Sequence, residues 1–188
     1  YYLAIQLNGL LVSLYLHDYM TIKVLILLQM LILGVACLEI TRHKTVQAKN
    51  ITLQNRLRWL LLGFACMVAF AVLISFLFPV QTRNQSVLVE VGKQVPHLIF
   101  LLFLVNASVL EEVFYRQLLW EKLTYPFVQI GVTSFLFALA HGPIQLGSWL
   151  IYSCLGLTLA VVRLKTDCMT AITLHLLWNS LVYVLTFL

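Results

Sequence analysis

Apolar residues dominate this chain in long runs that short polar segments separate. Most of these runs approach the roughly 20 residues that a helix needs to cross the hydrocarbon core of a bilayer. The runs, which predict about seven helices, occupy residues 1–16, 21–40, 59–80, 97–120, 127–141, 146–162 and 168–188. The sequence contains no internal repeat and no stretch typical of a soluble domain. We therefore expect one integral membrane domain over residues 1–188, all-α in class.

Composition supports the same fold class. Hydrophobic residues make up 62% of the 188 positions and charged residues only 10%. A soluble domain of this length would have far more apolar surface than one core could bury. The chain is therefore expected to be a polytopic transmembrane helical bundle with membrane lipids as its surroundings.

Lysine and arginine residues concentrate in alternate loops, which predicts an orientation by the positive-inside rule. If the loop over residues 41–58 is cytoplasmic, eight basic residues lie inside and three outside. The inside set is Arg42, Lys44, Lys49, Arg56, Arg58, Lys122, Arg163 and Lys165, and the outside set is Lys23, Arg83 and Lys93. We interpret the formal charge of +5 as topology and contact with anionic lipid, and expect no nucleic-acid partner.

Two consecutive carboxylates stand out within the apolar runs. Glu111 and Glu112 lie inside the fourth run, and Arg116 follows Glu112 at i,i+4. Ionisable groups at membrane depth are costly unless they pair or face a wet cavity. Glu112 and Arg116 have the spacing of an intrahelical ion pair, whereas Glu111 has no such partner. Glu111 is therefore the first candidate for chemistry.

The turn at Pro126 predicts which residue Glu111 can meet. Proline favours the first turn of a helix, and Glu111 and His141 each lie 15 residues from it on opposite sides. Both are thus about 22 Å of helix from the turn, at similar depth on adjacent antiparallel helices. The following Gly142-Pro143 predicts a helix break just past the histidine, which membrane proteins tolerate only when the backbone is buried or borders a cavity.

The last predicted helix presents one polar stripe. His175 and Asn179 are separated by four residues, so both side chains lie on one face of an otherwise apolar helix. We expect this face to point at the same polar intramembrane cavity as Glu111 and His141.

Three segments resemble the motifs of one protein family. Glu111 to Arg116, Phe137 to His141 and His175 to Asn179 match the EExxxR, FxxxH and HxxxN motifs of the CaaX protease and bacteriocin-processing (CPBP, or Abi) family of intramembrane proteases. The resemblance covers about 75 residues, so we divide the chain into motif-free helices over 1–96 and catalytic helices over 97–188. It implies a helical bundle with a cavity open to the cytoplasm, in a family whose eukaryotic members cleave prenylated CaaX proteins. Its bacterial members are associated with bacteriocin immunity and peptide maturation.

The residues suggest roles in hydrolysing a peptide bond of a membrane-associated peptide or lipidated protein. Glu111 is the candidate general base that activates water, and His141 holds the same water. His175 and Asn179 are the candidate oxyanion donors. Glu112 and Arg116 are expected to orient the helix that carries Glu111 without contacting the substrate.

Alternatives to a metal-independent protease stay open. No cofactor is expected, but Glu111, His141 and His175 also form a possible His2Glu zinc ligand set. A non-catalytic membrane scaffold or regulator with a membrane protein partner, and a proton-relay transporter, are further alternatives. We expect the plasma membrane of a prokaryote as the location, with the site accessible from the cytoplasmic side.

Overall fold

The computed structural model describes residues 2–43, 51–78 and 83–187, and every regular element in them is helical. In chain order the elements are α1 (Tyr2–Leu16), α2 (Ile22–His43), α3 (Leu53–Leu77), α4 (Arg83–Gln94), α5 (His97–Glu112), η1 (Val113–Leu118), α6 (Leu119–Lys122), α7 (Pro126–Ala140), α8 (Leu146–Lys165) and α9 (Cys168–Phe187). The element η1 is a π-helix that joins α5 to α6 without a break. The all-α class is confirmed.

Each of the predicted apolar runs forms a helix. Within the described residues five helical segments are long and apolar enough to cross a membrane, namely Ile22–Arg42, Leu53–Leu77, His97–Lys122, Leu146–Lys165 and Cys168–Phe187. Two apolar helices, Ile5–Leu16 and Pro126–Ala140, are shorter. The chain is thus a helical membrane bundle in which the helices differ in length.

The amphipathic helix α4 adds to the predicted set. Its sequence, RNQSVLVEVGKQ, is too polar to be identified as a membrane span, although Leu88 and Val91 pack on the apolar core beside α1, α2 and α5. A helix with one apolar face and low overall hydrophobicity suits the edge of a membrane protein better than its interior.

Helix ends follow local chemistry. Thr52 caps α3 by accepting a hydrogen bond from the Asn55 backbone N–H at 3.2 Å, so this helix begins before its apolar run. Pro126 occupies the first turn of α7, as predicted. Asp167 accepts a hydrogen bond from the Thr170 N–H at 2.9 Å at the start of α9.

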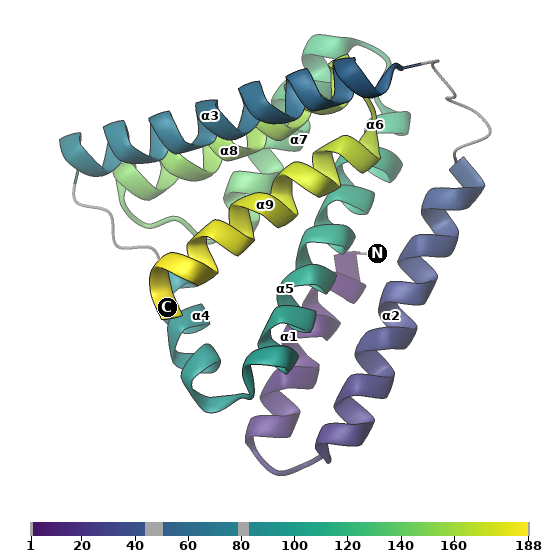
Figure 1. The fold of residues 1–188 in the computed structure, drawn as a ribbon, viewed down its shortest axis with the longest axis vertical. Helices are drawn as coiled ribbons and strands as arrows, with labels where there is room; N and C mark the ends of the chain where they lie inside the picture. The colour runs from purple at the N-terminus through teal and green to yellow at the C-terminus, as the bar shows by residue number, and fades with distance from the viewer. Residues whose placement is uncertain (1, 44–50, 79–82, 188) are drawn as a thin grey trace.

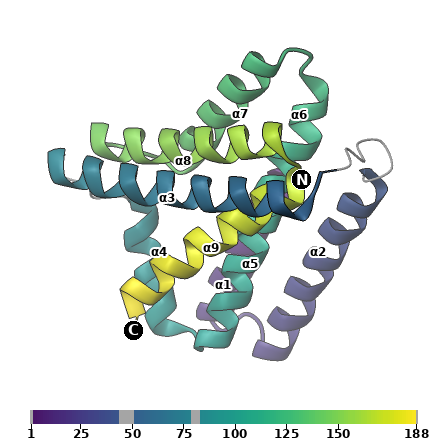
Figure 2. The ribbon, with the colours of Figure 1, turned by 45° about the horizontal axis from the view of Figure 1, so that its top comes forward.

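The helices form two groups that α9 connects. Helices α1, α2 and α5 pack together on one side, while α3, α7 and α8 pack together on the other, with α3 and α8 side by side along their lengths (Figures 1 and 2). Helix α9 contacts α5, α8, α3 and η1, and so lies between the groups. Residues near the middle of α9 are therefore placed among α3, α5 and α8.

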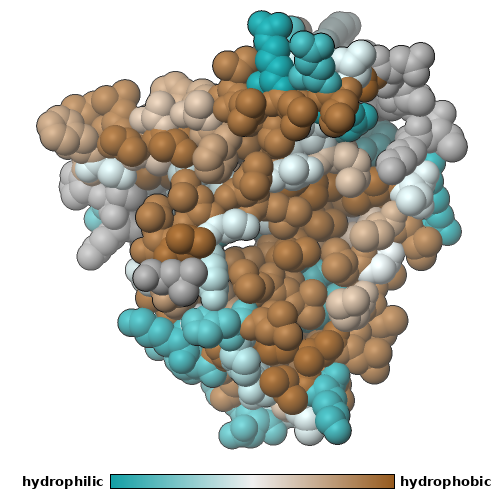
Figure 3. Space-filling view, in the orientation of Figure 1, coloured by the Kyte–Doolittle hydropathy of each residue, from teal (hydrophilic) through white to brown (hydrophobic). Residues whose placement is uncertain are grey.

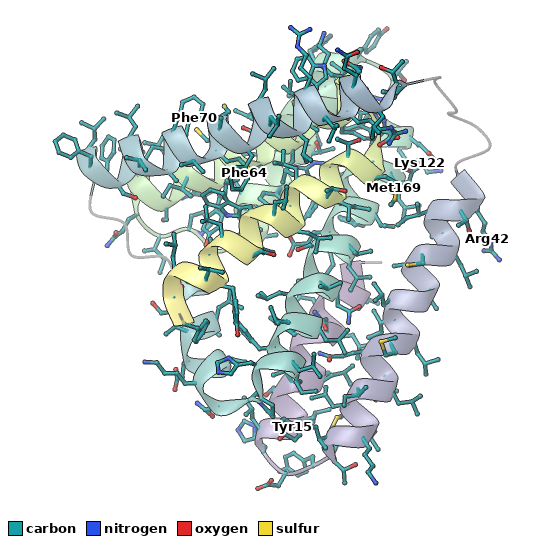
Figure 4. The ribbon with its side chains drawn as sticks, in the orientation of Figure 1. Tyr15, Arg42, Phe64, Phe70, Lys122 and Met169 are labelled. Atoms are coloured by element: carbon teal, nitrogen blue, oxygen red, sulfur yellow. The ribbon has the colours of Figure 1, made fainter. Side chains whose placement is uncertain are left out.

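The outer surface is apolar along the flanks and polar toward the ends. Hydrophobic residues cover most of the visible face, and hydrophilic residues gather at its upper and lower ends (Figure 3). Arg42 and Lys122 lie toward the end where α6 turns into α7, and Tyr15 lies at the opposite end (Figure 4). Lys44 and Lys49, which the orientation prediction also uses, lie outside the described residues.

A cluster of amides joins α1, α2 and α5 in the bundle interior. We call Asn8, Gln29 and Asn106 the carboxamide cluster, and all three are at most 1% exposed. Asn8 Nδ2 donates to the Phe103 carbonyl at 3.0 Å, Gln29 Nε2 donates to Asn8 Oδ1 at 3.4 Å, and Asn106 Nδ2 donates to the Gln29 carbonyl at 3.1 Å. These bonds link three helices where lipid offers no alternative partner.

Candidate active site

Glu111 and His141 meet as their equal spacing from Pro126 predicts. Glu111 Oε2 lies 3.8 Å from His141 Nε2, and both side chains are about one seventh exposed, at 14% and 13%. Within the described residues no hydrogen-bond donor reaches Glu111 Oε2. A separation of 3.8 Å exceeds a direct hydrogen bond but suits two groups that share one water molecule.

His141 is held firmly by its surroundings. Its Nδ1 lies 2.7 Å from the Phe137 carbonyl oxygen, one turn earlier on α7, where the only available role for the nitrogen is donor. The imidazole also stacks on Tyr152 of α8 with ring centroids 4.4 Å apart. In a neutral imidazole these contacts leave the lone pair on Nε2, the nitrogen that faces Glu111.

The helix breaks next to His141, as predicted. Helix α7 ends at Ala140, and Gly142 adopts a left-handed backbone conformation with φ of +58°. Glycine adopts this conformation without steric cost. Helix α8 then begins at Leu146, so His141 occupies the end of a helix at the bundle interior.

Glu112 is the centre of a buried ion-pair network. Its Oε2 lies 3.4 Å from Arg116 Nε, and its Oε1 lies 3.0 Å from His175 Nδ1. The Glu112 and Arg116 side chains are fully buried and the His175 side chain is 7% exposed. The i,i+4 pair was predicted, but the contact of Glu112 with His175 was not. We call Glu111, Glu112, Arg116, His141 and His175 the acid–histidine cluster.

Arg116 connects the cluster to neighbouring helices. Its Nη2 donates to the Gly156 carbonyl of α8 at 2.9 Å, and its guanidinium lies 5.0 Å from the centroid of the Phe137 ring of α7. The close approach of α8 requires a glycine, since a Cβ at position 156 would lie 3.0 Å from the Ser134 carbonyl oxygen. One buried cation thus holds α7 and α8 against the helix that carries both glutamates.

The π-helix η1 follows directly after the two glutamates. It spans Val113–Leu118, and Arg163 of α8 donates from Nε to the Arg116 carbonyl within it at 2.7 Å. A π-helical turn frees carbonyl groups from the α-helical pattern, and such turns are frequent at functional sites. Arg163, which is only 6% exposed, lies outside all three motifs, and the sequence indicated it only as a basic residue of the cytoplasmic side and not as a contact of the site.

His175 and Asn179 share a face of α9, as predicted, and each is already bonded through one nitrogen. His175 uses Nδ1 for Glu112, and Asn179 Nδ2 donates to Ser108 Oγ at 2.8 Å. The Ser108 hydroxyl in turn donates a hydrogen bond to the Leu104 carbonyl at 2.9 Å. The second N–H of the Asn179 amide and Nε2 of His175 are therefore the groups left for a ligand.

Two cavities meet at these residues. The first, which we call the aromatic cavity, has a volume of about 330 Å³ and is lined by Phe100, Trp178 and Tyr183 among others. The second, the α1 cavity, has a volume of about 250 Å³ and is lined by Gln6, Asn8 and Glu111 among others. His141, His175 and Asn179 line both cavities. A chain-like ligand that occupied both would cross the candidate site.

The proposed zinc ligands face the same space without forming a preformed metal centre. Glu111, His141 and His175 all line the α1 cavity. Among the residues that the structure describes, no group of three or more His, Cys, Asp or Glu side chains is arranged to hold a metal ion. His175 directs Nδ1 at Glu112, so only its Nε2 is available as a ligand. The zinc hypothesis stays a prediction for experiment.

The fold and the site define a class: a polytopic helical membrane protein with an acid–histidine cluster beside a break in one helix. Residues 93–181 match the family model described as type II CAAX prenyl endopeptidase Rce1-like. The matched segment contains all the motif residues and makes up slightly less than half of the chain.

One curated relative is also similar. The UPF0177 protein YvdC of Lactococcus lactis subsp. lactis (strain IL1403) is 30% identical over 128 residues, which cover 64% of this chain and 49% of the relative. The chain thus spans about half the length of that relative. No solved structure matches significantly.

Proposed function

We propose that this protein is an intramembrane endopeptidase that hydrolyses a peptide bond with water activated by Glu111. The observation that carries the proposal is the pair of Glu111 Oε2 and His141 Nε2, 3.8 Å apart at a wall of the α1 cavity. The match of residues 93–181 to a family model named for an endopeptidase supports the reaction class.

The two groups suit the activation of one water molecule. The Nε2 lone pair of His141 and Glu111 Oε2 are both acceptors, so a water between them donates one hydrogen bond to each. Its oxygen lone pairs then point away from both groups toward the cavity. Glu111 removes a proton as the oxygen attacks the carbonyl carbon, and the same carboxyl later protonates the leaving amine.

His175 and Asn179 supply the oxyanion donors in this mechanism. Since His175 donates from Nδ1 to Glu112, it donates from Nε2 only as an imidazolium. The carboxylates of Glu111 and Glu112 and the one guanidinium of Arg116 sum to a net charge of −1, which a histidine cation balances. Glu112 is then the counter-ion of this donor through Oε1, and its Oε2 pairs with Arg116.

The two cavities suggest how a substrate lies. A peptide that passes His141, His175 and Asn179 places one side of the scissile bond in the aromatic cavity and the other in the α1 cavity. We propose a membrane-associated peptide or lipidated protein as substrate, either through CaaX-type processing or through peptide maturation linked to bacteriocin immunity. The basic end of the bundle faces the cytoplasm of a prokaryotic cell in this proposal, with the site accessible from that side.

A cleavage assay tests the proposal. Detergent-purified protein is incubated with a quenched peptide library, and wild type is compared with Glu111→Ala and His141→Ala, each with and without a strong chelator. We expect both variants to lose cleavage and the chelator to have no effect. Cleavage that is lost to chelator and restored by zinc would instead establish the zinc-dependent mechanism.

The same assay distinguishes a scaffold from a protease. If wild type and both variants behave alike toward every peptide, including extracts of lipidated membrane peptides, the enzymatic proposal is wrong. A regulatory scaffold would then tolerate Glu111→Ala in cells, provided that the variant still reaches the membrane.

A further inference from the structure

A second hollow lies on the outside of the bundle, between α3 and α8. We call it the α3–α8 groove; it has a volume of about 360 Å³ and is remote from the motif residues, none of which lines it. Leu62, Phe70 and Leu157 line it and are 51%, 40% and 43% exposed, so the groove opens toward the surroundings of the protein. Helices α3 and α8 run side by side here (Figure 2).

The groove has an apolar surface along its length. Thr158 is its one hydroxyl side chain, and that hydroxyl donates to the Cys154 carbonyl of its own helix at 2.8 Å. Gly63 lines the groove where α3 lies nearest to its neighbours, since a Cβ there would come within 2.7 Å of Leu174 and 2.9 Å of Val162. Phe70 lies eleven positions after Trp59 on α3, so the groove is about 16 Å long, which is close to the hydrocarbon depth of one leaflet.

A cation stands at one end of the groove. Lys165 follows Val161 by one helical turn on α8, and its Nζ lies 5.9 Å from the centroid of the Trp59 ring on α3. Trp59 is the residue of α3 that lines the groove at this end. Tryptophan and lysine side chains are typical of the level of the lipid headgroups.

The charge of Lys165 is not neutralised by a neighbouring carboxylate. Asp167, the acidic residue nearest in sequence, pairs with Arg56 instead. In the part of the chain that the structure describes, Lys165 forms no ion pair, and its side chain is exposed. The groove therefore combines an acyl-sized apolar channel with an available positive charge at its headgroup end.

We propose that the α3–α8 groove binds an anionic phospholipid. One acyl chain lies along Leu62, Cys66 and Phe70, the headgroup glycerol rests against Trp59, and the phosphate contacts the Lys165 ammonium. An apolar groove alone accepts any acyl chain, and the unpaired cation selects the negatively charged headgroup. The lipid fills the space between the helices and so holds α3 against α8.

Native mass spectrometry of the detergent-purified protein tests the site with phosphatidylglycerol and phosphatidylcholine of identical acyl chains. We expect wild type to retain phosphatidylglycerol with about fivefold higher affinity, the factor that one interfacial lysine contributes. Lys165→Gln should abolish this preference without unfolding the protein, because the side chain is exposed. Lys23→Gln, an exposed lysine near the start of α2, is the matched control and should keep the preference.

A variant that fills the groove separates headgroup recognition from chain binding. Leu62→Trp is expected to reduce binding of both lipids several-fold while leaving their ratio unchanged. Equal binding of the two lipids by wild type, or an unchanged preference in Lys165→Gln, overturns the proposal. A protein dimer that excess lipid does not dissociate, and that Leu62→Trp disrupts, would assign the groove to a second copy of the chain. None of these measurements depends on peptide cleavage.

Discussion

The carboxamide cluster and the acid–histidine cluster place polar groups in the same apolar bundle, yet they differ in what surrounds them. The carboxamide cluster uses neutral amides whose N–H groups bond to side-chain or backbone oxygens of neighbouring helices. The acid–histidine cluster uses charged groups, and Glu111 and His141 keep partial exposure and unshared bonding capacity at a cavity wall. The carboxamide cluster is typical of hydrogen bonds that hold membrane helices together, whereas the acid–histidine cluster is typical of a reaction site.

Within the acid–histidine cluster the same contrast separates its two halves. Glu112 and Arg116 are fully buried, pair with each other, and contact His175 and the Gly156 carbonyl of α8. Glu111 lies beside Glu112 in sequence, but it has no arginine at i,i+4, and it lines the α1 cavity, which Glu112 does not. One turn of helix thus supplies both a rigid support and a group free to react.

The largest expected effect concerns Glu111. In Glu111→Gln the side chain keeps its shape but can no longer accept a proton, so we expect cleavage by the proposed enzyme to fall about 10²–10⁴-fold. The rate of cleavage of the best library peptide measures this. The free energy of unfolding should stay close to that of wild type, since within the described residues no hydrogen bond to Glu111 Oε2 would be lost.

Glu90→Gln is the control for that substitution. Glu90 lies on an exposed position of α4, so the same chemical change there should leave both cleavage and stability unaltered. If Glu111→Gln cleaves as fast as this control, Glu111 is not the general base.

The next largest effect concerns the buried ion pair. Arg116→Leu leaves Glu112 charged without its partner, and removal of one partner of a buried pair typically costs about 3–5 kcal/mol of stability. Chemical denaturation in detergent, followed by circular dichroism, measures the loss. The double variant Glu112→Leu with Arg116→Leu should recover much of it, because no uncompensated charge is left. Failure of this recovery would show that the pair matters through its contacts with α8 and His175 more than through its charge.

The packing between α7 and α8 gives a smaller effect. In Gly156→Ala the new methyl group meets the Ser134 backbone oxygen at 3.0 Å and Cα at 3.1 Å, neither of which can rotate away. We expect a loss of about 1–3 kcal/mol in the free energy of unfolding. Gly131→Ala on α7 is the matched control, since nothing lies within 4 Å of its added Cβ. That control should be stabilised by about 0.5–1 kcal/mol through helix propensity. Equal effects of the two substitutions would contradict the close packing at Gly156.

Much of this organisation follows from sequence because it depends on position along a helix. The apolar runs indicate the long helices, Pro126 sets the depth of Glu111 and His141, and Gly142 with Pro143 marks the break. The i,i+4 spacing also indicates the Glu112–Arg116 pair. Each of these inferences needs only the rise and periodicity of one helix or one hairpin.

The features that sequence reasoning missed depend on rotation and packing between helices. The spacing of His175 and Asn179 indicates a shared face, but the rotation of α9 decides that His175 meets Glu112 and Asn179 meets Ser108. The Arg163 bond to the Arg116 carbonyl requires a π-helical turn that no residue type signals. Helix α4 was missed for a different reason, because a hydropathy criterion for spans passes over a short amphipathic helix. Its apolar Leu88 and Val91, three residues apart, were the available signal.

The smallest expected effect tests whether the carboxamide cluster is structural alone. In a double-mutant cycle of Asn8→Leu and Gln29→Leu, the bond between Gln29 Nε2 and Asn8 Oδ1 should contribute a coupling energy of about 0.6 kcal/mol, as is typical between membrane helices. Thermal unfolding of the four proteins in one detergent measures it. Cleavage per folded molecule should be unchanged in Gln29→Leu, since Gln29 lines neither cavity. Asn8 lines the α1 cavity with Glu111. A selective loss of cleavage in Asn8→Leu would therefore show that the Asn8 amide contributes to the substrate site as well as to the contacts between helices. The carboxamide cluster and the acid–histidine cluster would then form one continuous polar surface of the substrate site, and not one structural cluster and one separate reaction site.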